Sequence, residues 1–216
     1  MKLTLLLILL CVAVYLYPFL FIGNEAGINN FYETYGFSGK NMVERPYVLV
    51  TSIFLHDPTN IVHLLSNIFV LFFFGMAVEK EIGSARMLAI FLLGSFLGDL
   101  MSLLVYSFDS IAVGASAGIF ALIGAGILLR PIDLSFAPFI IPMPLALLGA
   151  FYAFYNFYGF IAEPTGNVSY IAHFGGLFVG LTYGFKKTGI KKGMKIIMIA
   201  LTALIAIKIL LTMLVK

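Results

Sequence analysis

The sequence is poor in the two residue classes that stabilise many small soluble domains, charged residues and cysteines. Only 11% of its 216 residues are charged, and Cys11 is its single cysteine. One cysteine excludes an internal disulfide framework and a cysteine-built metal site. The low charge accompanies a hydrophobic share of 62%, which excludes an ordinary soluble domain. The bilayer, rather than water, is therefore the predicted solvent of most side chains.

Long apolar runs take the place of the missing charge. A helix needs about 20 apolar residues to cross a hydrocarbon core about 30 Å thick. Seven runs of roughly this length have approximate limits at 3–22, 60–79, 86–106, 115–130, 138–160, 169–186 and 194–215. The first could be a signal peptide, but its length and the lack of a small-x-small cleavage site favour a retained span. The sequence thus predicts an all-α, polytopic membrane helical bundle with no soluble domain between its spans.

Basic residues predict the orientation of this bundle. With a cytoplasmic N-terminus, the outside segments hold only Lys40, Arg45 and Lys216. The inside segments hold Lys2, Lys80, Arg86, Arg130, Lys186, Lys187, Lys191, Lys192 and Lys195. This asymmetry follows the positive-inside rule, so we expect this multi-pass protein to have its N-terminus in the cytoplasm. The membrane that we expect is the cell membrane, although the charges themselves do not identify it. The cluster at 186–195 is interpreted as a topology anchor, not as a nucleic-acid or specific lipid site.

Polar residues inside the spans give the sharpest functional signal, because such residues are costly in lipid. His63 and His173 fall about one turn inside the outer ends of the second and sixth runs, and Ser116 lies near the first turn of the fourth. The helical rise puts all three about 5 to 10 Å below the outer surface. Asn67 follows His63 by four residues and therefore shares its helix face. We expect these four residues to converge.

This convergence predicts a nucleophilic site. A serine hydroxyl needs a base to remove its proton, and a neutral imidazole within about 3 Å is a common base. Ser116 is therefore predicted to be the nucleophile and His173 its base. The oxyanion that forms needs preorganised donors, which His63, Asn67 and the backbone N–H of Ser116 could supply. No acid is placed to orient His173, so the sequence predicts a dyad rather than a triad.

Small residues at helical spacing predict close contact between the fourth and sixth spans. Gly114 and Gly118 form one GxxxG pattern, and Gly176 and Gly180 form another. The small face of the fourth span continues with Ala117, Ala121 and Ala125. Such patterns let two membrane helices approach closely. Either pattern alone more often reflects ordinary packing, so the prediction rests on their coincidence with the four polar residues named above.

Together these elements resemble the rhomboid intramembrane serine proteases, over residues 45–184. The matching elements are Arg45-Pro46-Tyr47 with Phe54-Leu55-His56, the HxxxN element His63 to Asn67, the turn Gly75 to Gly83 with Glu79, Gly114-Ala115-Ser116-Ala117-Gly118, and Ala172-His173-Phe174-Gly175-Gly176 with Gly180. Each element is weak alone, whereas the set is specific.

The resemblance implies a six-helix protease core at 1–186, followed by a basic linker and a seventh span at 187–216. It implies an intramembrane serine endopeptidase that cleaves single-span or multi-span membrane proteins near the outer face, without a cofactor or metal. The roles predicted above for the four polar residues match those of the family. The resemblance also implies that the first outer loop sits in the membrane, that the fifth span gates lateral entry and that a loop near 163–167 caps the site.

The sequence departs from the family at three points. Ala117 follows the serine where many relatives have glycine, Phe120 stands where a tyrosine often packs against the histidine, and the chain has no tryptophan. Phe120 still offers an aromatic face one turn below Ser116. We therefore expect it to hold the His173 ring by stacking, without the extra hydrogen bond of a tyrosine.

Other interpretations predict other functions. An inactive rhomboid-like protein that binds membrane clients is the main alternative, and the presence of both Ser116 and His173 disfavours it. A transporter or channel is supported only by polar residues in the spans. Asp99 could indicate an aspartyl intramembrane protease, but residues 96–98 are Phe-Leu-Gly rather than the GxG that this family requires. A metalloprotease is disfavoured because the sequence contains no HExxH motif. A structural role for Asp99 is favoured over substrate or proton handling.

Overall fold

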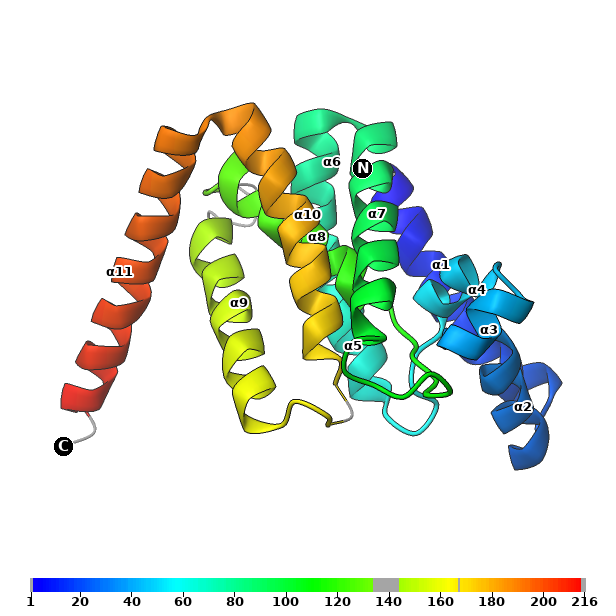
Figure 1. The fold of residues 1–216 in the computed structure, drawn as a ribbon. Helices are drawn as coiled ribbons and strands as arrows, with labels where there is room; N and C mark the ends of the chain where they lie inside the picture. Colours follow the sequence, from blue (N-terminus) through cyan, green and yellow to red (C-terminus); the bar gives the residue numbers. More distant parts are fainter. Residues whose placement is uncertain (1, 134–143, 167, 215–216) are drawn as a thin grey trace.

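The computed structural model describes residues 2–133, 144–166 and 168–214, and these fold into a bundle of helices (Figure 1). Helices make up 80% of the structure and the described ranges contain no strand, which confirms the all-α prediction. The helices are α1 (Lys2–Phe21), α2 (Glu25–Tyr35), α3 (Gly39–Glu44), α4 (Val48–Thr51), η1 (Ser52–Phe54), α5 (Ile61–Val70), η2 (Leu71–Gly75), α6 (Met76–Ile82), α7 (Ser84–Ser102), α8 (Ser116–Leu129), α9 (Leu145–Ala162), α10 (Tyr170–Thr188) and α11 (Ile190–Leu214).

Each predicted span corresponds to a helical rod. The second span is one rod made of α5, the π-helical turn η2 and α6, and the other spans are α1, α7, α8, α9, α10 and α11. Five of these rods are long and apolar enough to cross a membrane, and α8 is a shorter apolar helix. The predicted start of the fifth span at 138 and the predicted end of the seventh at 215 lie outside the described residues. Helices α1 and α11 lie on opposite sides of the bundle in Figure 1.

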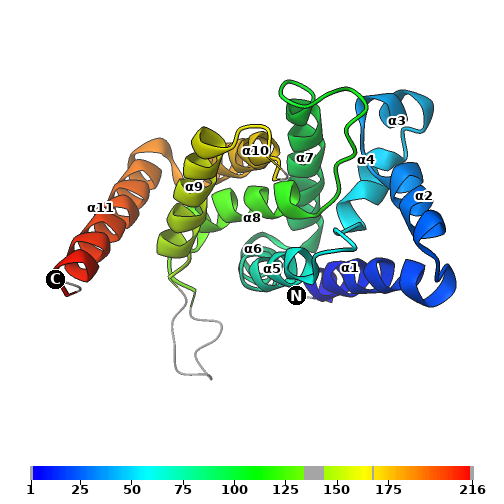
Figure 2. The same cartoon turned by 90° about the horizontal axis from the view of Figure 1, so that it is seen from below.

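Helix α8 forms the centre of the bundle. Figure 2 shows it surrounded by α7, α9, α10 and the rod of α5 and α6. Every residue from Ala117 to Leu128 is buried. A helix that is apolar all round can be stable only when other helices cover it on all sides, so its sequence dictates its central position. With 14 residues α8 is about 21 Å long, shorter than the hydrocarbon core, and its first residue therefore lies inside the bundle.

Glycines of α10 allow it to lie directly against α8. A Cβ atom at Gly176 would overlap the carbonyl oxygen of Ala117, and one at Gly180 would overlap that of Ala121. Contact of this kind, between backbone and backbone, is possible only without side chains at these two positions. The second of the predicted GxxxG patterns therefore brings α8 and α10 together, as expected.

The first GxxxG pattern does not make this contact, which corrects the prediction. Gly118 faces α7, where a Cβ atom would lie 2.7 Å from the carbonyl oxygen of Phe91. Gly114 precedes α8 and has a φ of +130°, a conformation that L side chains rarely adopt. The physical reason is the rotation of α8 about its axis, which turns Ala117 and Ala121, rather than Gly118, toward Gly176 and Gly180.

A buried carboxylate joins the start of α1 to the turn between α6 and α7. Glu79 is 3% exposed and accepts hydrogen bonds from the backbone N–H groups of Leu3 (3.1 Å) and Thr4 (2.9 Å). It also accepts from the hydroxyls of Thr4 (2.6 Å) and Ser84 (2.7 Å). Two of these donors are among the first N–H groups of α1, which have no partner within their own helix. The carboxylate thus caps α1 and fixes it to the bundle.

Replacing Glu79 with alanine is expected to lower the free energy of unfolding by about 3 kcal/mol, because buried donors lose their acceptor. Denaturant titration in mixed micelles measures this change. Glu81→Ala is the matched control, since the Glu81 side chain is 46% exposed and its ion pair with Arg130 spans 3.8 Å. An exposed pair of this kind contributes about 0 to 1 kcal/mol. An equal loss in the two variants would contradict the capping role.

The connection between α1 and α5 is built from short helices rather than irregular chain. Asn24 and Ser38 cap the N-termini of α2 and α3 by accepting from backbone N–H groups. The Tyr32 hydroxyl donates to the carbonyl oxygen of His56 over 2.8 Å. The backbone N–H of Gly114 donates to the carbonyl oxygen of Ser52 over 3.0 Å. The connection is thereby anchored beside the turn that leads into α8.

Candidate active site

Ser116 is the first residue of α8 and follows a tight turn. The positive φ of Gly114 redirects the chain, and Ala115 is the N-cap of the helix. A Cβ atom at Gly114 would lie 3.1 Å from Nε2 of His63 and 3.8 Å from Oγ of Ser116. Because Ser116 occupies the first turn, its backbone N–H has no acceptor within the helix. The turn thus presents a hydroxyl, a free N–H and an imidazole side by side.

His173 meets Ser116 across the contact between α10 and α8. Its Nε2 lies 2.8 Å from Oγ of Ser116, which is hydrogen-bond distance. The ring of Phe120 stacks on the His173 ring, with centroids 4.4 Å apart and planes 9° apart. This stacking is what the sequence predicted for Phe120, and it fixes the plane of the imidazole.

One large cavity contains the predicted residues. It has a volume of about 1250 Å³ and is lined by residues from the rod of α5 and α6, from α8, α9 and α10, and from the connecting segments. The predicted residues among them are His63, Asn67, Ser116, Phe120 and His173. The structure therefore brings together the four polar residues that the depth of the spans predicted to converge.

The hydrogen bonds of His63 leave its second ring nitrogen as a donor. The backbone N–H of Asp57 donates to Nδ1 of His63 over 3.3 Å. A neutral imidazole that accepts at Nδ1 carries its proton on Nε2. That nitrogen is the one beside Gly114 and the first turn of α8. His63 thus directs an N–H group toward the space next to Ser116.

Asn67 is held partly by its own helix. Its Nδ2 donates to the carbonyl oxygen of His63 over 2.7 Å, and its Oδ1 has no hydrogen-bond partner among the described residues. The side-chain amide has a second N–H, which this bond does not use. Asn67 is 7% exposed and lines the cavity. Its predicted part beside an oxyanion therefore rests on one remaining N–H group.

A third histidine, His56, packs behind His63. It is fully buried, its Nδ1 lies 3.3 Å from the carbonyl oxygen of Phe54, and its ring centroid lies 5.2 Å from that of His63. Burial lowers the pKa of His56 to about 4, and nearby His63 acts in the same direction. His56 is thus neutral at physiological pH and supports His63 by packing.

Asn156 of α9 is a site residue that the sequence analysis did not single out. Its Oδ1 lies 2.7 Å from Nδ1 of His173, and its Nδ2 donates to the carbonyl oxygen of Tyr170 over 3.1 Å. The sequence interpretation treated 151–160 as an aromatic belt at the membrane surface. The sequence nevertheless contained a signal, because Asn156 is a polar residue inside an apolar span. Polar residues in spans are costly, and the same criterion identified His63 and His173.

The segment predicted to cap the site does border the cavity. Thr165, Gly166 and Val168 line it, while residue 167 lies outside the described residues. The hydroxyl of Tyr106, from the connection between α7 and α8, lies 2.9 Å from the carbonyl oxygen of Val168 and 3.2 Å from that of Gly166. This tyrosine ties the segment that precedes α10 to the other side of the cavity mouth.

Asp99 does not line this cavity. It lies in α7, and its Oδ2 is buried with no hydrogen-bond partner among the described residues. No group of three or more histidine, cysteine, aspartate or glutamate side chains in the described ranges could hold a metal ion.

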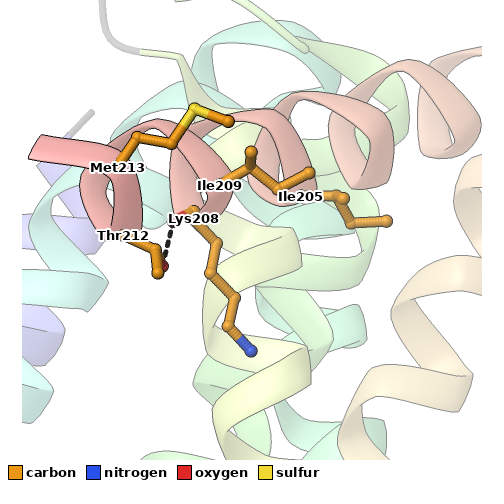
Figure 3. Close-up of a pocket in the computed structure, with 5 residues that line it drawn as sticks. All are labelled: Ile205, Lys208, Ile209, Thr212 and Met213. Carbon is orange, nitrogen blue, oxygen red and sulfur yellow. Dashed lines mark hydrogen bonds between the residues drawn. The ribbon is translucent and has the colours of Figure 1, made fainter. Parts of the chain in front are cut away.

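A second, smaller hollow lies on the last helix. Figure 3 shows it on α11, lined by Ile205, Lys208, Ile209, Thr212 and Met213. The Thr212 hydroxyl donates to the carbonyl oxygen of Lys208 over 2.8 Å, so it serves its own helix. Because a single helix provides the whole lining, this hollow offers no converging groups of the kind that line the larger cavity.

Comparison with known proteins identifies the family. The family model described as "Rhomboid domain" matches residues 43–190, more than half of the chain. RHOMBOID-like protein 12, mitochondrial, of Arabidopsis thaliana is 29% identical over 152 residues, which are 62% of this chain and 44% of that protein. RHOMBOID-like protein 7 of the same plant is 31% identical over 142 residues, covering 63% and 41%.

A bacterial relative matches a shorter stretch. Putative rhomboid protease YdcA of Bacillus subtilis (strain 168) is 36% identical over 76 residues, which are 35% of this chain and 37% of that protein. The matches to all three relatives thus span less than half the length of each relative. The family match, by contrast, includes both the turn before α8 and the histidine of α10. This multi-pass helical membrane protein therefore belongs to the rhomboid family.

Proposed function

We propose that this protein is an intramembrane serine endopeptidase that cleaves membrane-spanning segments near the outer face of the bilayer. Ser116 is the nucleophile and His173 the general base. The observation that carries this proposal is the 2.8 Å contact between Oγ of Ser116 and Nε2 of His173, inside a cavity of a helical membrane bundle. A serine needs such a contact for nucleophilic attack but not for helix packing.

The first chemical step forms a bond between Oγ of Ser116 and the substrate carbonyl carbon, while the hydroxyl proton passes to Nε2 of His173. The carbonyl oxygen becomes an oxyanion. Nε2 of His63 and Oγ of Ser116 both lie near Gly114, so the Nε2–H of His63 and the backbone N–H of Ser116 are the proposed donors to this oxyanion. The positive end of α8 adds to their field. Asn67 supplies its remaining amide N–H.

The second step breaks the C–N bond of the substrate. The imidazolium of His173 gives its proton to the leaving amine, and the acyl group stays on Ser116. Water then attacks the ester with the same histidine as base. The bond between the acyl carbon and Oγ of Ser116 breaks, His173 returns the proton to Oγ, and the product leaves as a carboxylate. The substrate has to unwind locally before the first step, because a helix in lipid keeps every carbonyl in its own hydrogen bonds.

The positions of the basic residues support an orientation with the N-terminus in the cytoplasm. The location that we propose is the cell membrane. In this orientation the α8 turn and the cavity lie on the outer side. Residues 1–186 form the protease core, and the linker with α11 at 187–216 is an addition to it. Only Gly193 and Ala200 of α11 are buried, which suits a helix at the edge of the bundle (Figure 1).

Reconstitution of the purified chain into liposomes tests the proposal. One sample receives a panel of single-span substrates with small or helix-breaking residues near the outer end of the span. A parallel sample receives a fluorophosphonate probe. Cleavage near the outer end and covalent labelling of Ser116 are expected. A chain that binds these substrates without cleaving them, and that the probe leaves unlabelled, would instead be a client-binding protein, and the proposal would fail.

A further inference from the structure

We propose that Asn156 is a positioning residue which fixes the tautomer and the orientation of His173. This inference rests on the proposed function, and it adds a third member to the predicted dyad. Asn156 comes from α9, whereas Ser116 and His173 come from α8 and α10. The completed group therefore draws on three different helices.

Three hydrogen bonds link Ser116, His173, Asn156 and Tyr170, and the direction of each follows from the bond to Tyr170. The carbonyl oxygen of Tyr170 can only accept, so the atom of Asn156 that faces it over 3.1 Å has to be the NH₂ group. The amide oxygen then faces Nδ1 of His173 over 2.7 Å and can only accept, so Nδ1 carries the proton. A neutral ring with its proton on Nδ1 has a free lone pair on Nε2, where the Ser116 hydroxyl lies.

The burial of Asn156 shows that its place is set by these bonds. It is 1% exposed, whereas the neighbouring Phe154, Tyr155, Phe157 and Tyr158 are each more than half exposed. In the outer half of α9 the other buried residue is Gly159, which lies against the Tyr170 ring. An amide buried in a lipid-facing aromatic segment is costly unless it is fully bonded. Both ends of this amide are bonded, one of them to the proposed base.

A neutral amide does part of what the aspartate of a Ser-His-Asp triad does. It holds the imidazole and selects the tautomer, but it adds no negative charge to stabilise the imidazolium; the Cys-His-Asn proteases use an asparagine in the same position. In a membrane this has an advantage, because a buried carboxylate would carry a large desolvation cost. Phe120 fixes the plane of the ring and Asn156 fixes its rotation within that plane.

Kinetics of the reconstituted chain test this role. Asn156→Leu, which has similar volume but no acceptor, is expected to reduce kcat by about 100-fold while KM changes less than about twofold, since the base is misplaced but the cavity remains. Asn156→Asp loses the bond to the Tyr170 carbonyl oxygen and buries a carboxyl group, but it keeps an acceptor at Nδ1 of His173. It is therefore expected to lose less activity than Asn156→Leu and to stay within about tenfold of the intact chain. Tyr158→Phe on the exposed side of α9 is the matched control, expected to leave kcat unchanged.

Nuclear magnetic resonance provides a readout that needs no turnover. In a chain labelled with ¹⁵N-histidine, His173 is expected to show its proton on Nδ1, and the signal is assigned by its loss in His173→Ala. Asn156→Leu is expected to shift this ring toward a mixture of tautomers, with the unfolding midpoint as the check that the bundle is intact. A proton on Nε2 of His173 in the intact chain would overturn the inference, whatever the variants do.

The outcomes separate this inference from the proposed function. If the intact chain cleaves and Ser116→Ala does not, while Asn156→Leu cleaves as fast as the intact chain, only the inference fails. If Asn156→Leu and Asn156→Asp lose the same activity, the role is packing and the inference also fails. If the intact chain cleaves nothing, the proposed function fails and the positioning role falls with it.

Discussion

Replacing Ser116 with alanine is expected to abolish cleavage, with a fall in kcat of about 10⁶-fold if the residue acts as serine nucleophiles do elsewhere. The hydroxyl forms the covalent bond in the proposed first step, and it lies 2.8 Å from Nε2 of His173, the proposed base. The variant should still bind substrate, because the cavity lining loses a single oxygen atom. Product formation in liposomes and co-purification of an uncleaved substrate measure the two effects.

The double variant Ser116→Ala/His173→Ala sharpens this prediction. When two residues act as one catalytic unit, the effects of their substitutions on kcat do not add. The double variant should therefore have the same residual kcat as Ser116→Ala alone. Ser95→Ala is the matched control, because Ser95 is a buried membrane serine whose hydroxyl donates to the carbonyl oxygen of Phe91 over 3.0 Å. Its activity should be close to that of the intact chain. Cleavage that persists without the Ser116 hydroxyl would rule out the nucleophile assignment.

Replacing Gly176 with alanine is expected to have the second largest effect, a fall in kcat of about 100-fold. The added methyl group would overlap the carbonyl oxygen of Ala117, a backbone atom that cannot rotate away. Helix α10 then has to move off α8, which lengthens the distance from His173 to Ser116. Overpacking of this kind also lowers the free energy of unfolding by about 1 to 3 kcal/mol. Cleavage assays and denaturant titration measure the two changes.

A graded control lies two turns further along the same helix. The atoms nearest to a methyl group at Gly184 would be Cδ1, Cβ and Cγ of Leu128, at 2.8 to 3.2 Å, whereas a methyl group at Gly176 would overlap a backbone carbonyl oxygen. The overlap at Gly184 is smaller, and the end of the leucine side chain can adjust to it. Gly184→Ala is therefore expected to reduce kcat less than tenfold. If both substitutions cost the same activity, the separation of α8 and α10 at the site is not what limits the reaction.

The spans and the serine–histidine pair could be predicted because each depends on local sequence. Apolar length determines where a membrane helix can lie, and depth along it follows from the helical rise. Ser116 and His173 could thus be paired from their distance to the span ends alone. The helices of the first connection were not predicted, because they are short and carry no long apolar run. Their caps at Asn24 and Ser38 are visible in the sequence only in retrospect.

Contacts that depend on helix rotation could not be predicted. The spacing of Gly114 and Gly118 suits a helix contact, but which neighbour they meet depends on how α8 is turned in the bundle. Gly118 meets α7 instead of α10. Asn156 was missed for a related reason, since its aromatic neighbours indicate a membrane surface and only the packing of α9 on α10 shows that this one side chain points inward.

The hydrogen-bond chain from Ser116 ends at the carbonyl oxygen of Tyr170, and a peptide carbonyl does not take up a proton near neutral pH. In the proposed reaction, the proton that leaves the hydroxyl therefore cannot travel beyond the imidazole. It passes from there to the leaving amine, and the water that attacks the ester supplies, through the same histidine, the proton that restores the hydroxyl. Hydrolysis then moves no net charge across the bilayer. The proposed reaction is therefore expected to proceed equally well with and without a proton gradient across the membrane.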